Sequence, residues 1–156
     1  MVQCSSSVDN KAINKLKLME IEKDIQDIID YSHKFAEKML IEHKEYYPFG
    51  VAINKKGELI PVGYKDNETD MPKSQKIIEE LRIHFQSELE KQEIRAYGIT
   101  YDVLVNLDDL KEKSDAILID ITHRDSTNLP KYYFTYLWTN EGELVFGESF
   151  GINRWI

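Results

Sequence analysis

The sequence has little cysteine, proline or glycine, and it has no long hydrophobic run. Its single cysteine, Cys4, cannot form a disulfide within the chain, so packing must hold the fold, as is usual in reducing compartments. No stretch approaches the roughly eighteen apolar residues that a transmembrane helix needs. Cys4 and the serines after it are also typical of a lipid-anchored start, but the residues before Cys4 contain no signal region. We therefore predict a cytoplasmic protein with no membrane partner.

A basic excess is also lacking. The chain has 20 Lys and Arg against 28 Asp and Glu, which gives a formal net charge of -8. Nucleic-acid binding is driven by cationic side chains that neutralise phosphates, so nucleic acid is not expected as a partner. A basic protein partner fits this charge better, although charge of this size also serves simply to keep a protein soluble.

What the chain does have is enough apolar material for one core. Its 156 residues are 42% hydrophobic and 11% aromatic, which is the range of ordinary globular domains. We find no internal repeat and no convincing linker. The sequence predicts a single domain over residues 1–156, with residues 1–9 flexible.

A long amphipathic helix is predicted from Asn10 to about His43. Its apolar residues recur at helical spacing, with charged residues between them, and Pro48 ends it because the residue before a proline avoids helical geometry. The spacing also allows a break between Lys15 and Leu18. The residues on the apolar face are Leu18, Ile21, Ile25, Ile28, Ile29, Phe35, Ala36 and Met39.

A β-hairpin and a second helix follow. Residues 49–53 and 59–62 are extended segments around the polar turn 54–57, and Pro61 places the second of them at an edge or a bulge. Pro72 suits the first turn of a helix. The apolar face of that helix consists of Ile77, Ile78, Leu81, Phe85 and Leu89.

After Gln92 the hydrophobic period changes to two, which is typical of strands. Strands are predicted at 97–105, 116–121, 132–138 and 144–146, and their short connections require antiparallel pairing. The predicted fold class is α+β: a long N-terminal helix, a β-hairpin, a second helix, and then antiparallel strands. We expect one mainly antiparallel sheet with the helices packed on one face.

Motifs that carry recognisable chemistry are missing. The sequence contains no histidine pair at metal-binding spacing, no glycine-flanked nucleophile and no phosphate-cradling loop. We therefore expect no metal and no cofactor, and the sequence favours a protein that is not an enzyme without settling the matter.

Two aspartates form the candidate catalytic or cation-binding group. Asp102 and Asp120 fall on the strand faces opposite the aliphatic residues, so they can converge across neighbouring strands, with His123 close by. Paired carboxylates serve in acid–base catalysis or bind hard cations. The alternative is that this face is simply solvated, as one face of an antiparallel sheet commonly is.

Aromatic residues are concentrated in the strand at 132–138, on both of its faces. Only one face can pack against the core, so either Tyr132, Phe134, Tyr136 and Trp138 or the alternate set with Tyr133 and Leu137 must cover something else. Tyrosine and tryptophan are favoured at interfaces. The first set is our candidate binding surface, and cover by a helix of the same chain is the alternative.

Three segments resemble small bacterial proteins of no assigned function: the hairpin entry Tyr46-Tyr47-Pro48-Phe49-Gly50, the turn at 54–60 and the ending at 145–150. The order of elements is similar to that of roadblock and longin-like modules, which act as dimerising scaffolds. The resemblance itself carries no activity. The acidic charge, the surplus aromatic residues and the lack of recognisable motifs favour a non-catalytic protein-interaction or binding module, such as an adaptor or immunity-type protein, bound to a protein partner or to a second copy as a homodimer. The alternative is a small enzyme or a ligand- or cation-binding domain that uses the polar sheet face.

Overall fold

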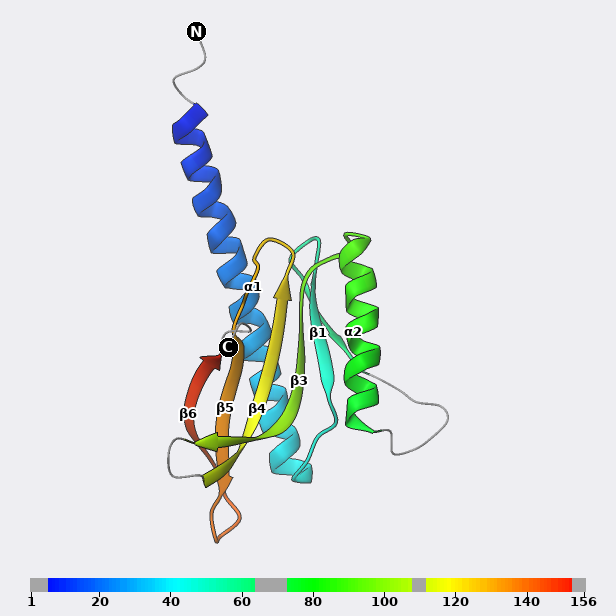
Figure 1. Cartoon of the computed structure of the whole chain (residues 1–156), viewed down its shortest axis with the longest axis vertical. Helices are drawn as coiled ribbons and strands as arrows, with labels where there is room; N and C mark the ends of the chain where they lie inside the picture. Colours follow the sequence, from blue (N-terminus) through cyan, green and yellow to red (C-terminus); the bar gives the residue numbers. More distant parts are fainter. Residues whose placement is uncertain (1–5, 64–72, 108–111, 153–156) are drawn as a thin grey trace.

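The computed structural model describes residues 6–63, 73–107 and 112–152. In these ranges the chain forms two helices and a six-stranded antiparallel sheet, which confirms the predicted α+β class (Figure 1). The elements are α1 (Ser6–His43), β1 (Phe49–Asn54), β2 (Leu59–Val62), α2 (Ser74–Glu90), β3 (Ile94–Leu107), β4 (Glu112–His123), β5 (Lys131–Trp138) and β6 (Leu144–Ile152).

The strands are arranged in the order β2-β1-β3-β4-β5-β6, so the two hairpins form the two edges of the sheet. The β2 edge is short and contains Pro61. The β6 edge is interrupted, because Phe134 is opposite Ser149 and Tyr136 is opposite Phe146, which leaves two residues of β6 opposite Thr135. The Thr135 hydroxyl donates a hydrogen bond to the carbonyl oxygen of Glu148 at this bulge, at 2.7 Å.

The two helices lie on opposite faces of the sheet, which corrects the expectation of helices on one face. Val51 and Ile53 of β1 pack in a cluster with α1, whereas Ala52 between them packs in a separate cluster with α2. Successive residues of a strand point to opposite faces, so the two clusters are the two sides of the sheet. A Cβ atom at Gly98 would lie 2.6 Å from Ile28 of α1.

The reason for this error lies in the composition of β3. Its larger residues, Tyr97 and Ile99, suggest a single core face, and the opposite face, with Gly98 and Thr100, looks too small and polar to be buried. In the structure Gly98 and Thr100 are covered by α1, and Tyr97 and Ile99 are covered by α2. Small side chains let the long helix approach the sheet closely, so the polar-looking face is also core.

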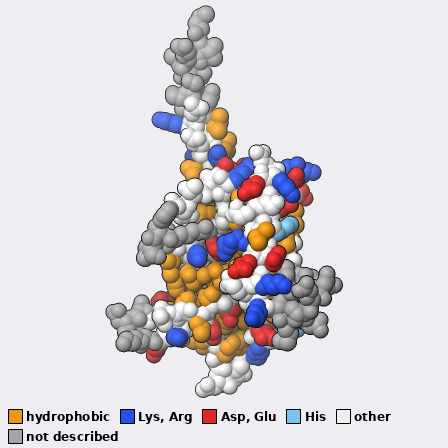
Figure 2. Space-filling view, turned by 45° about the vertical axis from the view of Figure 1, so that its right-hand side comes forward, with side chains coloured by type: hydrophobic (Ala, Val, Ile, Leu, Met, Phe, Trp, Pro, Cys, Tyr) orange, Lys and Arg blue, Asp and Glu red, His pale blue; other side chains and the backbone are white. Residues whose placement is uncertain are grey.

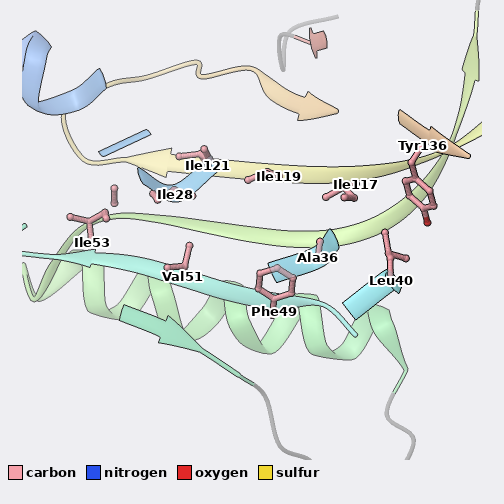
Figure 3. Close-up of a cluster of buried hydrophobic side chains, with 11 residues drawn as sticks. Ile28, Ala36, Leu40, Phe49, Val51, Ile53, Ile117, Ile119, Ile121 and Tyr136 are labelled. Carbon is pink, nitrogen blue, oxygen red and sulfur yellow. The ribbon is translucent and has the colours of Figure 1, made fainter. Parts of the chain in front are cut away.

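The core between α1 and the sheet is aliphatic over most of its length (Figure 3). Ile117, Ile119 and Ile121 of β4 form one row and Phe49, Val51 and Ile53 of β1 form another, with β3 between them and Ile28 of α1 near Ile121. At the other end of the same cluster, Leu40 of α1 lies near Tyr136 of β5.

Helix α1 is longer than the sheet that it covers. Its N-terminal part rises above the strands in Figure 1. The helix continues through Lys15 to Leu18, where the sequence had allowed a break. The expected flexibility of residues 1–9 falls partly outside the described residues, since 6–9 belong to α1 and 1–5 are not described. Among the described helices, none combines the length and the apolar character needed to cross a membrane.

Candidate functional site

Asp102 and Asp120 do not form a pair. In the register between β3 and β4, Asp102 is opposite Ile117 and Asp120 is opposite Ile99. Ile117 belongs to the α1 side of the sheet and Ile99 to the α2 side, so the two carboxylates point to opposite faces. The predicted convergence is therefore wrong. The aliphatic faces of these two neighbouring strands point in opposite directions, and sequence alternation alone cannot show that.

Asp120 is buried on the α2 side, where its carboxylate lies 3.5 Å from the guanidinium of Arg82 in α2. Its charge also raises the pKa values of Tyr101 and Tyr133 beyond the increase that burial causes. Asp120 thus ties α2 to the centre of the sheet.

Asp102 lies on the α1 side, beyond the end of the helix. The hydroxyl of Tyr136 donates a hydrogen bond to its carboxylate at 2.7 Å. Loss of water around the carboxyl group raises the pKa of Asp102; the hydrogen bond from Tyr136 opposes this shift, and the charge of Asp115 adds to it. The structure thus brings together Asp102 and Tyr136, two residues that the sequence analysis had assigned to different sites.

The second carboxylate on this side of the sheet is Asp115, which is directly opposite Tyr136 across β4 and β5. Neither Asp102 nor Asp115 forms an ion pair with any residue that the structure describes. Burial, together with the negative charge of Asp102, raises the pKa of Tyr46, whose hydroxyl is buried without a hydrogen-bond partner. The cluster thus joins two carboxyls, Asp102 and Asp115, to the phenols of Tyr46 and Tyr136 on the α1 side of the sheet.

His123 belongs to a different cluster, between the sheet and α1. Its Nε2 lies 2.9 Å from the carboxylate of Asp24, which also accepts two hydrogen bonds of 2.8 Å from Arg95. The backbone N–H of Asp125 donates to Nδ1 of His123 at 3.1 Å, which places the imidazole proton on Nε2. Arg95 also reaches Glu20 at 2.9 Å.

This cluster is a structural clamp. The side chains of Asp24 and His123 are almost completely buried, and both ring nitrogens of His123 already have partners. A general base needs a free nitrogen within reach of a substrate. His123 therefore holds α1 onto the end of β4 and is not positioned for catalysis.

The sequence analysis missed Asp24 and Arg95, although one signal for Asp24 was present. Asp24 comes three residues after Ile21 and four before Ile28, so it lies on the apolar face of α1. A charged residue at such a position needs a buried partner, but periodicity cannot identify that partner in a distant strand.

The candidate binding surface on β5 is mostly covered by α1. Tyr136 is buried, and Tyr132, Phe134 and Trp138 are partly buried against the α1-side core. The ring of His33 in α1 contacts Phe134, with 4.9 Å between ring centroids. Of the two interpretations of this strand, the structure thus favours cover by a helix of the same chain for these four residues.

The alternate face of β5 is the more accessible one. Here a row formed by Tyr101, Leu118, Tyr133 and Phe150 crosses four neighbouring strands. Further along β5 and β6, the cross-strand pair Leu137 and Val145 has exposed side chains, with relative exposures of 54% and 43%. Helix α2 packs on the same side of the sheet but contacts β1 and β3. We call this group the apolar sheet surface; it consists of Tyr101, Leu118, Tyr133, Phe150, Leu137 and Val145.

Two features give the apolar sheet surface its shape. The rings of Tyr133 and Phe150 are stacked, with 5.2 Å between their centroids. Within the row, Leu118 is buried, whereas Tyr101 and Tyr133 are partly exposed. Figure 2, which brings the α2 side forward, shows hydrophobic side chains gathered beside charged ones in this part of the molecule.

A second exposed apolar group lies on the part of α1 that extends beyond the sheet. The side chains of Ile13, Leu16, Leu18 and Met19 are each more than half exposed. Large apolar side chains this exposed on one short helical segment are typical of a surface that another molecule covers.

Comparisons with known proteins add no functional information, because no family model, no curated protein and no solved structure matches the chain. In the described residues, no three His, Cys, Asp or Glu side chains are grouped so as to hold a metal ion.

Proposed function

We propose that this chain is a non-catalytic protein-interaction module that binds its partner through the apolar sheet surface. The observation that carries this proposal is the exposed pair Leu137 and Val145, which lies on the same face of β5 and β6 as the stacked pair Tyr133 and Phe150. Antiparallel sheets that face water usually present polar side chains there, whereas Leu137 and Val145 are apolar and exposed on this face. A partner that covered this face would remove a continuous apolar area from water.

Tyrosine and phenylalanine at the centre of this surface support the same proposal. Tyr133 and Phe150 are stacked against each other, so their rings lose little conformational freedom when a partner covers them. Such ordered aromatic residues are the side chains that contribute most binding energy at interfaces.

The alternative of a small enzyme has lost its supporting geometry. It needed Asp102 and Asp120 on one face with His123 beside them, but the aspartates point to opposite faces and His123 is buried in the clamp with Asp24. The interaction module is the function that the remaining geometry supports best.

The test is a double charge substitution in the apolar sheet surface, Leu137→Lys with Val145→Lys. Affinity capture from the native cell and light scattering of the purified protein would report association with a partner and with a second copy. We expect the double variant to lose the complex that wild type forms. Ile41→Lys with Ile83→Lys is the matched control, since both residues are more than half exposed but lie on the helices.

Circular dichroism must first show that the variants are folded. If the folded sheet variant retained every association of wild type, or if wild type associated with nothing, the proposed function would be wrong.

A further inference from the structure

The two helices leave part of the sheet without helical cover. Helix α1 covers β1, β3 and β4 on one side, whereas α2 covers β1 and β3 on the other. Helix α2 reaches one end of the apolar sheet surface at Tyr101, whereas in the described residues Leu137 and Val145 at the other end remain 54% and 43% exposed. At the same time, the N-terminal segment of α1, Asn10–Met19, extends beyond the sheet of its own chain (Figure 1). The molecule thus has an uncovered sheet surface and an unused length of helix.

The exposed segment is amphipathic. Ile13 and Leu16 are three residues apart and Met19 follows after three more, so these side chains share one side of the helix together with Ala12. Lys15 and Lys17 lie at the two borders of this apolar stripe. A basic amphipathic helix of this kind is typical of a segment that docks on an apolar surface with an acidic rim.

The charges of the two surfaces are complementary. Asn10–Met19 contains three lysines and no acidic residue, while the whole chain carries -8, which leaves -11 for the rest. The hairpin of β5 and β6, which carries four of the six residues of the apolar sheet surface, has three glutamates and one lysine. The glutamates are Glu141, Glu143 and Glu148, and all three are exposed.

The charge pattern also argues against the simplest dimer, in which two such segments pair with each other. Each segment would bring its lysines beside those of its partner, and there is no carboxylate between Asn10 and Met19 to compensate them. Like charges in contact destabilise helix pairs.

The dimensions of the two surfaces also match. Ten helical residues extend over about 15 Å. Tyr133 and Leu137 are four residues apart on β5, which is about 13 Å, and Phe150 and Val145 lie opposite them on β6. One segment is therefore long enough to run along β5 and β6 from Tyr133 to Leu137.

We propose that Asn10–Met19 of one copy docks on the apolar sheet surface of a second copy, and that the exchange is reciprocal across a two-fold axis. This rests on the proposed function and names the partner as the same chain. The apolar stripe covers Leu137, Val145, Tyr133 and Phe150. Lys11 and Lys15 face the glutamates of the β5–β6 hairpin, since Lys17 already pairs with Asp125 of its own chain at 3.4 Å. Reciprocity gives two identical contacts and closes the assembly at two copies.

The test introduces negative charges on the helix segment and positive charges on the apolar sheet surface of the full chain. One variant carries Ile13→Glu with Leu16→Glu, and the other carries Leu137→Lys with Val145→Lys. We expect wild type to be a dimer at about 100 μM and each variant alone to be a monomer by light scattering. An equimolar mixture of the variants restores the dimer, because one contact is native and the other joins glutamates to lysines.

Each other outcome overturns the proposal in a recognisable way. A dimeric sheet variant indicates pairing between helices, and a dimeric helix variant indicates pairing between sheets. A mixture that stays monomeric excludes the reciprocal exchange, as does a monomeric wild type. If wild type is monomeric and yet captures a different protein that the sheet variant loses, the proposed function holds and the self-docking proposal fails.

Discussion

Asp24 shows how one buried charge positions a whole helix. Its carboxylate accepts two hydrogen bonds from Arg95 and a third from His123, so α1 is fixed to β3 and β4 at one point. The hydrogen bonds that Arg95 donates to Asp24 are also the main reason why the pKa of Arg95 is raised. A buried ion pair of this kind adds little net stability, but removing one partner leaves the other charge uncompensated.

Replacing Asp24 should therefore be costly. We expect Asp24→Ala to lower the free energy of unfolding by about 3 kcal/mol or more, because Arg95 would keep a buried charge and His123 would lose its acceptor. Urea denaturation measures this change. Asp27→Ala is the matched control: Asp27 is on the same helix, and its partner Lys23 is exposed. Equal denaturation midpoints for the two variants would contradict the clamp.

The raised pKa of Asp102 predicts a specific pH dependence of stability. A carboxyl group that binds its proton more tightly when folded stabilises the protein fully below its ordinary pKa of 3.8, and that stabilisation is lost as the pH rises through the folded value. Asp102→Asn removes this dependence and keeps an acceptor for Tyr136. We expect the variant to gain stability relative to wild type as the pH rises from 3.8, measured by denaturation at a series of pH values.

Asp125 provides a control of opposite sign. Burial would raise the pKa of Asp125, but its hydrogen bond from Arg124 and the charges of Arg124 and Lys17 outweigh burial and lower it. The group therefore stabilises the fold above its ordinary pKa, and this contribution is lost as the pH falls through the folded value. Asp125→Asn should lose stability relative to wild type above that ordinary pKa. If the stabilities of Asp102→Asn and Asp125→Asn, each relative to wild type, changed with pH in the same direction, the assigned environments of the two carboxyl groups would be wrong.

The individual residues of the site could be predicted only in part. The sequence identified Asp102 and Tyr136 as unusual, but not that they bond to each other, because their contact depends on the register of three strands. It also chose the aromatic face that α1 covers and left the face with Leu137 as the alternative. Alternation shows that a strand has two faces, but not which of them a distant helix will cover.

At the scale of elements, two glycines determine how closely the helices approach the sheet. A Cβ atom at Gly98 would lie 2.6 Å from Ile28 of α1, and one at Gly50 would overlap the ring of Phe85 in α2. These glycines belong to neighbouring strands and serve opposite faces. Both helices therefore approach the sheet closely at its centre, one on each face.

We predict that Gly98→Ala destabilises the protein by about 1 to 3 kcal/mol, because the new methyl group overlaps Ile28 and the close-packed helix cannot yield easily. The same substitution should cost less when Ile28 is replaced by Ala, and a double-mutant cycle measures this coupling. Gly63→Ala is the control, since no atom lies within 4 Å of its added methyl group. Additive effects at Gly98 and Ile28 would contradict the close approach.

The order of elements could be predicted well from the sequence, while their layering could not. The long helix, the first hairpin, the second helix and the later strands all occur where their periodicity placed them, although β4 and β6 extend further than expected. Periodicity is a local property, so it identifies elements. Which side of the sheet a helix takes depends on the small residues Gly98 and Thr100, which looked like a solvent-facing pattern.

At the scale of the whole molecule, the segment Asn10–Met19 has few contacts of its own, and helices this short are marginal in water without tertiary packing. In a reciprocal dimer its amides gain protection when it docks. We therefore expect slow hydrogen exchange at residues 11–19 in wild type and fast exchange in the variant Leu137→Lys with Val145→Lys. Exchange in β4 serves as the internal reference, and equal protection of the segment in both proteins would contradict docking.

The contact between lysines and glutamates should also make association sensitive to salt. Exposed charge pairs are screened as ionic strength rises, so the dissociation constant of the wild-type dimer should increase between low and high salt. Sedimentation at several salt concentrations measures this change. A dissociation constant that falls as salt rises would indicate an interface held by apolar contacts alone.

The two edges of the sheet have a consequence for how this protein behaves when it is concentrated. Growth of cross-β fibres requires an open strand edge on which a further chain can form a regular ladder. Pro61 removes an N–H from the short β2 edge, and the bulge opposite Thr135 bends the β6 edge. Neither described edge is a good template, so the folded protein should resist growth into amyloid fibres even at high concentration.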